Sequence, residues 1–592
     1  MCAIAGIVRF DRPAETSRLA VKLMLRRMRH RGLDDVGVLV NSHAALGNAR
    51  LSMADLAGGK QPVTSLDGRW HLTYNGEVYN WRELRQELSD QWMFRTQSDT
   101  EVVLAALALW GATALKRFNG MFALFLWDDQ TQTGFAARDR LGVKPFVFSN
   151  EDGVFAFSSE AKALVAALET PRADAQAVLE YLVAPYFSGV ERPMFKTLHH
   201  LLPGQYLRVS RKGVELTTWW DWQLPDEWDM DDGPLTAELT RHLVSGVQRT
   251  LEADHPAGAF LSGGLDSTLL SSLAARHRGE LRTFAIQFQE QAEFNYNHSM
   301  MVRSDDTPHA EAAAREIGSN HSIVSVSRQN LPEDLRSLAH INDALPAWEQ
   351  ELAQYHLSHA AAEHGLRCIL VGDAADETHY GYPFLLDPES TGSPGHILRR
   401  FGLPPLNREL TEGKVWETLE ASYQTLTEAA GHHWDTPQAR LLATTYLIVK
   451  RWLPRLLHNG DIHTMAFSIE ARLPFADNDV IELSQKVHPS LALAGGFEKH
   501  LLRQAACGLM PEANRTRPKS ALPKDQHSGA VYQREAAQAV NESKVFLGHW
   551  LDLGAIRELC RPDRQLTESE RALLFRVISL HHWRQCFNVR EP

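Results

Sequence analysis

The chain has 592 residues, a formal net charge of −12 and 44% hydrophobic side chains. An acidic chain of ordinary globular composition argues against general binding to nucleic acid or to anionic membranes. At about 100–200 residues per domain, the length predicts two or more domains. The five cysteines include no CxxC pair, so we expect free thiols in the cytoplasm rather than disulfides or a structural zinc site. We find no secretory signal and no apolar run of ~18 residues, and expect no membrane span.

The first third of the chain reads mainly as short strands. Segments rich in aromatic and β-branched residues lie at 3–10, 37–40, 70–80, 121–128, 133–139 and 146–150. Helical patterns lie at 18–30, 80–90 and 99–111, and Ser98-Asp99 provides an N-terminal cap for the last. A hairpin at 201–220 completes the unit. We predict an α+β domain with many antiparallel strand pairs.

The pattern changes after a polar, acidic stretch with two prolines near 220–235, which predicts a linker. We therefore expect domains at 1–215 and 236–592. In the second domain, strand-like segments at 258–262, 281–288 and 367–373 alternate with long helical stretches. This alternation indicates an α/β domain with a parallel sheet flanked by helices. The polar, irregular segment 289–308 predicts a mobile loop.

The most informative stretch is a glycine-containing loop between a strand and a helix. Leu261 ends the strand and Ser262-Gly263-Gly264-Leu265-Asp266-Ser267 follow. Glycines let backbone N–H groups approach an anion, and the helix N-terminus adds donors and partial positive charge. Asp266 would repel phosphate unless Mg²⁺ lay between them. The alternative is a plain glycine turn.

The same loop lacks the Walker pattern and resembles the pyrophosphate-binding loop of ATP pyrophosphatases. These enzymes activate a carboxylate or similar oxygen as an adenylate. The resemblance implies ATP and Mg²⁺ as cofactors.

Two further segments carry charges suited to the same chemistry. Gly372-Asp373-Ala374-Ala375-Asp376-Glu377 follow a strand, at the edge where parallel sheets bind ligands. Asp376 can share Mg²⁺ with Asp266, although a solvated acidic loop is the alternative. Lys519 lies in a loop between Pro518 and Ser520, where a lysine can meet phosphate as a point charge. Taken alone, it would be read as a surface lysine.

Cys2 stands directly behind Met1. It can be a small buried hydrophobe at the head of a strand. If Met1 is removed, however, Cys2 carries both a thiol and a free α-amine that can activate it as a nucleophile.

Ten motifs in order resemble the glutamine-hydrolysing asparagine synthetase family, and they span nearly the whole chain. They are Met1-Cys2, His30-Arg31-Gly32, Arg50-Leu51-Ser52, Tyr74-Asn75-Gly76-Glu77, Ser98-Asp99-Thr100-Glu101, 137–145, 262–267, 372–377, 468–477 and 517–519. The resemblance implies an N-terminal-nucleophile hydrolase sandwich followed by an ATP-pyrophosphatase domain.

For the first half, the resemblance implies a class II glutamine amidotransferase. Cys2 would attack the glutamine carboxamide, with its own α-amine as base. Asn75 and Gly76 match the oxyanion-hole positions. The remaining glutamine-binding positions are Arg50 for the α-carboxylate and Glu77 and Asp99 for the α-ammonium.

For the second half, the resemblance implies adenylation of a carboxylate with release of pyrophosphate. Ammonia from glutamine would travel inside the protein and displace AMP to give an amide. Lys519 matches the lysine that stabilises charge around the adenylate. The implied ATP-binding positions are Leu261, Ser262, Gly263, Gly264, Asp266, Ser267, Ile286 and Gly372, with Asp266 and Asp376 as metal ligands.

Four departures from the family pattern matter. Ala3 replaces a usual glycine, and Leu33 replaces a usual proline. In the loop that usually reads S-G-E-G-x-D-E, Val371 replaces serine and Asp373 replaces a glutamate placed near the reacting centre. Adenylation remains the expected chemistry, while the acceptor acid is open between aspartate and another, natural-product or peptide-like acid.

Three other functions compete with amidation. Relatives that close rings tend to lose the glutaminase residues, which this chain keeps. An N-terminal-nucleophile amidohydrolase with a regulatory second half would not need the intact loop at 262–267. A non-catalytic sensor would not need both sets of reactive residues. We expect small-molecule partners (glutamine, ATP and a carboxylic acid) and, by analogy alone, a homodimer.

Overall fold

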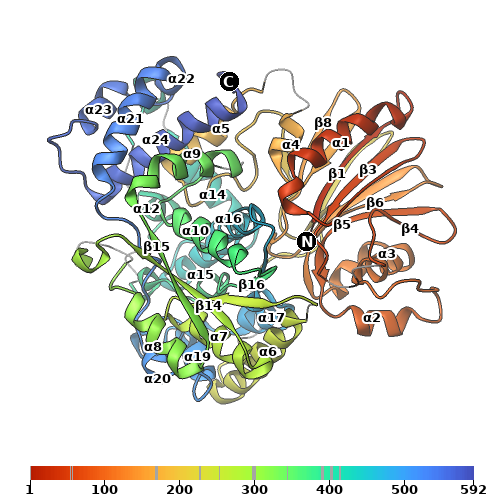
Figure 1. Cartoon of the computed structure of the whole chain (residues 1–592), viewed down its shortest axis with the longest axis horizontal. Coiled ribbons are helices and arrows are strands. Elements are labelled where there is room, and N and C mark those ends of the chain that lie inside the picture. Colours follow the sequence, from red (N-terminus) through yellow and green to blue (C-terminus); the bar gives the residue numbers. More distant parts are fainter. Residues whose placement is uncertain are drawn as a thin grey trace.

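The computed structural model separates the strands of the N-terminal half from the mostly helical C-terminal half (Figure 1). It describes residues 2–592 except 54, 56–57, 167–170, 224, 226–227, 253, 297–301, 343–344, 388–391, 400–403 and 413–414. Within this described part, no helix combines the length and apolar character needed to cross a membrane.

Two antiparallel sheets of six strands form the N-terminal domain. The first has the order β10-β8-β9-β1-β3-β2 and the second the order β12-β11-β7-β6-β5-β4. The first sheet comprises β1 (Cys2–Arg9), β2 (Asp35–Val40), β3 (Ala44–Arg50), β8 (Val147–Glu151), β9 (Val154–Ser158) and β10 (His199–His200). The second comprises β4 (Val63–Thr64), β5 (Trp70–Val78), β6 (Gly120–Asp128), β7 (Thr133–Arg138), β11 (Gln205–Ser210) and β12 (Gly213–Thr218).

The two sheets pack face to face through aromatic side chains. Phe125 on β6 stacks on Phe157 of β9 with ring centroids 4.4 Å apart. Helices α1 (Arg18–Arg27) and α4 (Ala161–Val165) cover the first sheet, and α2 (Trp81–Leu88) and α3 (Asp99–Trp110) cover the second. The predicted α+β sandwich is confirmed. Strands such as β1 and β3 are buried along their whole length, because one face of each sheet meets the other sheet and the opposite face meets helices.

The C-terminal domain is built on a parallel sheet of five strands, in the order β15-β14-β13-β16-β17. The strands are β13 (Ala257–Phe260), β14 (Arg282–Phe288), β15 (Asn320–Val326), β16 (Cys368–Leu370) and β17 (Glu470–Arg472). The helices α6 (Asp232–Leu251), α7 (Leu265–Arg278), α8 (Thr307–Ile317), α9 (Leu331–Ile341) and α10 (Gln350–Glu363) lie before and between these strands along the chain. The α/β prediction for this half is also confirmed.

Further helices complete the described part of the chain. In chain order they are α5 (Ala175–Val183), α11 (Ala375–Thr378), α12 (Pro394–Arg399), α13 (Arg408–Glu412), α14 (Val415–Ala429), α15 (Pro437–Leu447), α16 (Leu453–Met465), α17 (Asn478–Lys486), α18 (Pro489–Ala492), α19 (His500–Ala505), α20 (Glu512–Arg515), α21 (Gly529–Glu542), α22 (Lys544–Gly548), α23 (Leu553–Leu559) and α24 (Glu568–Phe587). A capping box at Thr567 and Glu570 starts α24, which packs with α9 and α21 at one end of the molecule (Figure 1).

The segment for which we predicted a mobile loop, 289–308, is described only in part, since residues 297–301 lie outside the described residues. Its described parts contact the loop that carries Lys519. The Arg303 backbone N–H donates to Ser520 Oγ at 3.1 Å, and Arg517 pairs with Asp306 at 2.5 Å.

The loop between β16 and α11 contains a strained residue. Ala374 has φ 77° and is fully buried. The family pattern carries glycine at this position, where the left-handed conformation has no steric cost. For an L-residue this conformation costs roughly 1–2 kcal/mol.

We therefore predict that Ala374→Gly stabilises the protein by about 0.5–1 kcal/mol, because relief of strain exceeds the entropy that glycine adds to the unfolded chain. The measurement is the thermal unfolding midpoint. Ala375→Gly is the matched control. Ala375 begins α11 with ordinary helical geometry, so glycine there should destabilise by up to about 1 kcal/mol. A fall of the midpoint in both variants would contradict the strain at Ala374.

Candidate functional site

Cys2 lies at the start of β1 and is 5% exposed. Its backbone N–H donates to Asn75 Oδ1 at 3.0 Å, and the Gln61 amide lies 3.7 Å from its Sγ. Burial raises the pKa of the Cys2 thiol. A thiol in this position needs a nearby base to become a nucleophile.

Asn75 and Gly76 lie side by side on β5. The side-chain amide nitrogen of Asn75 is buried and has no hydrogen-bond partner among the described residues. Buried donors are rarely left unpaired, so this nitrogen is suited to a ligand oxygen close to Cys2. Gly76 has no room for a side chain, since a Cβ there would lie 2.3 Å from the Met121 carbonyl.

The predicted glutamine-binding charges surround the same strand ends. Arg50 is directly opposite Cys2 in the β1–β3 pairing and donates to the Asp55 carbonyl at 2.7 Å. Asp99, at the start of α3, accepts hydrogen bonds from Tyr74 Oη at 2.9 Å and from the Val78 backbone at 3.2 Å.

Glu77 follows Gly76 on β5. Burial, together with repulsion from Glu470, raises the pKa of Glu77 to about 8. Glu470 lies on β17 of the other domain, where it pairs with Arg472 at 2.5 Å. The structure thus brings Cys2, Arg50, Asn75, Gly76, Glu77 and Asp99 to neighbouring ends of β1, β3, β5 and α3.

Sequence reasoning missed two contacts of this site. Gln61 accepts from the Tyr74 backbone at 2.7 Å and from Asn48 at 3.1 Å, which aims its amide at Cys2. Arg31 is fully buried, and its Nε donates to the Cys2 carbonyl at 3.3 Å. Arg31 stands in a motif that we quoted, but its contact with Cys2 depends on strand pairing that the motif does not specify.

A second site lies at the carboxyl edge of the parallel sheet. Its cavity, which we call the sheet-edge cavity, is lined by the loop after β13, by β14, by the loop after β16 and by residues near Lys519. The predicted residues that line it are Leu261, Ser262, Gly264, Asp266, Ser267, Ile286, Gly372, Asp373, Asp376 and Lys519.

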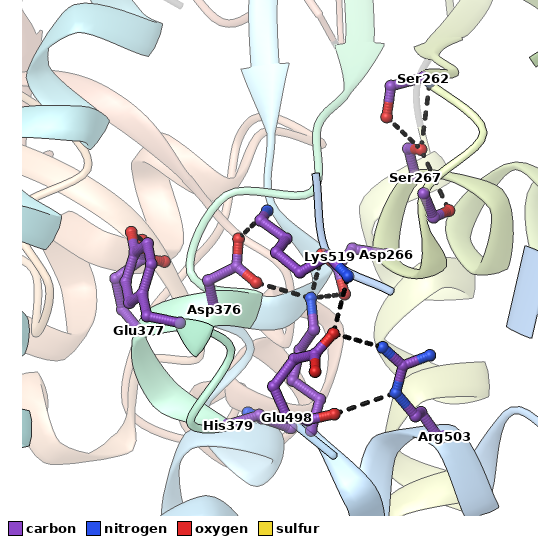
Figure 2. Close-up of polar contacts among 12 residues, drawn as sticks. Ser262, Asp266, Ser267, Asp376, Glu377, His379, Glu498, Arg503 and Lys519 are labelled. Carbon is purple, nitrogen blue, oxygen red and sulfur yellow. Dashed lines mark hydrogen bonds and ion pairs between the residues drawn. The ribbon is translucent and has the colours of Figure 1, made fainter. Parts of the chain in front are cut away.

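Gly263 does not line this cavity but is required beneath it. Its φ is 73°, and a Cβ would lie 2.6 Å from the backbone of His309 and Ala310. Ser267 Oγ accepts from the Ser262 backbone at 3.2 Å and lies 3.1 Å from Ser262 Oγ (Figure 2). These contacts hold the loop at the N-terminus of α7, the local structure that an oxyanion needs.

Lys499 lies between the two predicted metal ligands, and sequence reasoning missed it. Its ammonium donates to both oxygens of Asp266 at 2.9 and 2.7 Å and to Asp376 at 2.6 Å. Lys519 binds the other oxygen of Asp376 (Figure 2). Burial alone would raise the pKa of Asp376, but Lys499 and Lys519 outweigh burial and hold that pKa at about 2.

Glu498 connects the segments that carry the two lysines. It pairs with Arg503 at 2.6 Å and accepts from the Lys519 backbone N–H at 2.8 Å (Figure 2). Arg503 also donates to the Arg517 carbonyl at 3.0 Å. Hydrogen bonds to its backbone therefore hold the Lys519 loop in place, and the Lys519 side chain is left to form an ion pair with Asp376.

Asp373 faces the same cavity from the other side. A Cβ on Gly460 of α16 would lie 3.2 Å from Asp373 Oδ2 and 3.4 Å from the Gln354 amide, so these three residues are close neighbours. Burial and the Asp376 charge raise the pKa of Asp373 to about 6. Glu377, by contrast, binds Tyr382 and does not line the cavity.

The pair Asp266 and Asp376 fits a magnesium ion that arrives with phosphates. Mg²⁺ is usually held by one or two carboxylates together with substrate phosphates rather than by a complete protein cage. Accordingly, no group of three or more potential His, Cys, Asp or Glu ligands occurs in the part of the chain that the structure describes.

Profiles of known protein families match both halves of the chain. A profile described as glutamine amidotransferase domain matches residues 1–220, and one described as asparagine synthase matches residues 238–585. The second match alone covers more than half of the chain. The chain belongs to the asparagine synthase family. It is accordingly a ligase, and relatives across most of its length support glutamine-dependent, ATP-driven amidation.

Named relatives resemble the chain at about the same level. Asparagine synthetase [glutamine-hydrolyzing] 3 of Bacillus subtilis is 30% identical and aligns with 89% of this chain and 88% of its own length. Asparagine synthetase B of Escherichia coli is 26% identical, with 86% and 80% covered. Amidase chyE of Penicillium rubens is also 26% identical, with 89% and 88% covered.

We predict that Asp376→Asn and Asp266→Asn each reduce ATP-dependent amide formation by 100-fold or more, because preorganised charge at a reacting phosphate typically contributes that much. Glutaminase activity should remain measurable. Release of AMP and pyrophosphate is the readout. Glu377→Gln is the matched control, since Glu377 is adjacent in sequence but turned toward Tyr382. If Glu377→Gln lost as much AMP and pyrophosphate release as the two aspartate variants, the two aspartates would have no special role.

Proposed function

We propose that the chain converts a carboxylic acid to its primary amide through an acyl-adenylate, with ammonia taken from glutamine. The observation that carries this proposal is the sharing of Lys499 by Asp266 and Asp376 beside the loop at 262–267. This arrangement concentrates charged side chains at an edge of the parallel sheet that is suited to binding phosphate groups. The reactive cysteine of a glutaminase lies in the other domain.

In the first half-reaction, Cys2 is the nucleophile after removal of Met1. Its α-amine takes the thiol proton as Sγ attacks the glutamine carbonyl carbon. Asn75 Nδ2 and the Gly76 backbone stabilise the negative oxygen. The C–N bond then breaks, the proton passes to the leaving nitrogen as ammonia, and water hydrolyses the thioester to glutamate.

In the second half-reaction, the acceptor carboxylate attacks the α-phosphorus of ATP and pyrophosphate leaves. Asp266 and Asp376 would hold Mg²⁺, which neutralises phosphate charge when bound. Lys519 stabilises charge on the departing pyrophosphate. Ammonia, delivered inside the protein, then attacks the acyl carbon and AMP leaves, which gives the amide.

Aspartate is the default acceptor, by analogy with the names of most relatives quoted above. Asp373 supports a second candidate, a larger or differently shaped acid. Its side chain is one methylene shorter than the glutamate of the family pattern, which leaves ~1.5 Å more room by ordinary bond lengths. Gly460, opposite Asp373, adds no side chain of its own. One relative of similar identity carries the name amidase and not asparagine synthetase.

We further propose a cytoplasmic homodimer. The five free cysteines among the described residues support the cytoplasmic location, since free thiols suit a reducing compartment. The dimer rests on analogy with relatives.

Cys2→Ala is predicted to abolish glutamine-dependent synthesis by several orders of magnitude while ammonia-dependent synthesis is retained, because only the first site loses its nucleophile. The assay compares amide formation from glutamine and from ammonium salts. Cys507→Ala is the control, since Cys507 is exposed and free. If Cys2→Ala lost both activities while folded, the division into two sites would be wrong. If Met1 were retained in fully active protein, by intact mass, the α-amine would not be the base.

The acceptor is tested by AMP release with aspartate and with a panel of bulkier acids, in wild type and in Asp373→Glu. The second candidate predicts that wild type favours a bulkier acid and that Asp373→Glu improves aspartate turnover, since about 1 Å of misplacement can cost ~100-fold in rate. Wild type that prefers aspartate, with no effect of Asp373→Glu, would identify an ordinary asparagine synthetase. Absence of acid-dependent AMP would instead favour an amidohydrolase with a regulatory second half.

A further inference from the structure

A second cavity lies beside the sheet-edge cavity, and the proposed reaction does not use it. Phe294, Trp348, Lys524, Arg571 and Arg576 are among its lining residues. We call it the α24 cavity, because the first turns of α24 form one wall.

Arg576 is the unusual residue of the α24 cavity. Arg576 is 4% exposed, and its Nε is buried with no hydrogen-bond partner among the described residues. Among the described residues, no carboxylate forms an ion pair with its guanidinium. Burial lowers the pKa of Arg576, which reflects the cost of keeping this charge away from water. A buried cation without a counter-charge is costly and rare in folded proteins.

The other charges of the α24 cavity do not compensate Arg576. Arg571 also lines the cavity with a buried, unpartnered Nε. Glu568, the carboxylate among the lining residues, forms an ion pair with Lys524. Lys524 also lies 3.6 Å from Glu349. The cavity therefore has an excess of positive charge in a chain whose net charge is −12.

Aromatic and apolar groups complete the walls. Trp348 stacks on Tyr186 with ring centroids 4.7 Å apart, and Phe294 lies on the same lining. Large apolar surfaces beside a fixed cation are the usual composition of a site for a small organic ion.

The two cavities share two walls. On α10, Gln354 lines the sheet-edge cavity and Gln350, one turn earlier, lines the α24 cavity. In the loop that carries Lys519, Leu522 and Pro523 line the first cavity and Lys524 lines the second. A ligand in the α24 cavity would therefore contact the loop that positions Lys519.

We propose that the α24 cavity binds a small organic anion, with a carboxylate or phosphate against Arg576 and an apolar body against Trp348. The ligand supplies a counter-charge that the described residues do not supply. This site is distinct from the glutamine, nucleotide and acceptor positions proposed above.

The test is calorimetric titration of the full chain with benzoate, phenyl phosphate and neutral benzamide, with and without saturating ATP. Benzoate and phenyl phosphate distinguish the carboxylate from the phosphate source of the anion, and benzamide matches benzoate without its charge. We expect at least one anion to bind more tightly than benzamide, and Arg576→Gln to weaken that binding ~10- to 100-fold, as expected for hydrogen bonds to a charged group. Arg584→Gln is the matched control, because Arg584 lies on α24 outside the cavity lining.

Thermal unfolding separates binding from a structural role. Without ligand, Arg576→Gln should raise the unfolding midpoint, because it removes an unpaired buried charge, and it should lose the stabilisation that the anion gives wild type. A lower midpoint for Arg576→Gln without ligand would show a structural role and overturn the proposal. Equal affinity for benzoate, phenyl phosphate and benzamide, undiminished anion binding by Arg576→Gln, or no binding by wild type would do the same. Arg571→Gln changes the second arginine of the cavity and is expected to weaken anion binding as well.

Discussion

The arrangement of the sheet-edge cavity depends on one buried lysine shared by two carboxylates. Asp266 and Asp376 follow the neighbouring parallel strands β13 and β16, so the fold forces their charges together. Two carboxylates held close together would raise the pKa of one of them and favour its protonation. Lys499 contacts both, and with Lys519 it keeps the pKa of Asp376 at about 2. At the proposed metal site, a cation that arrived with phosphates would have to share these oxygens with the two lysines, so the ion pairs of the free protein would compete with the cation.

Buried arginines connect the two domains close to both sites. Arg31 joins the Cys2 carbonyl to Asp461 at 2.6 Å, and Asp461 follows Gly460, the neighbour of Asp373. Arg472 on β17 pairs with Glu470 and lies 4.0 Å from Glu77. Removal of one partner from such a buried pair typically costs about 3–5 kcal/mol. The backbone at each site is thus held partly by charges of the other domain, which makes independent motion of the two domains costly.

The sequence predicted the elements whose local signals agree with their surroundings. The segments rich in aromatic residues became β5 and β6, and the capped segment after Ser98 became α3. The strand β3 (Ala44–Arg50) was missed because its sequence, AALGNAR, has little β-propensity. It is a strand because β1 and β2 pair with its backbone on both sides. The loop at 262–267 was predictable from its strand–loop–helix order. Lys499 was not, since it meets Asp266 across 233 residues of chain and no local pattern marks it.

The two ends of the sheet-edge cavity are built on different principles. At the phosphate end, backbone geometry restricts which residues fit. Gly263 has a positive φ and no space for a side chain, so few other residues are tolerated at this position. At the acceptor end, the loop accepts a strained Ala374, whose carbonyl is held by Thr378 Oγ1 at 2.7 Å and whose side chain is fully buried. Surroundings that fix a residue this firmly can maintain an unfavourable conformation. The loop path, and with it the direction of Asp373, is therefore kept. On the proposed assignment of Asp373 to the acceptor, a side chain can change there without moving the phosphate end of the cavity.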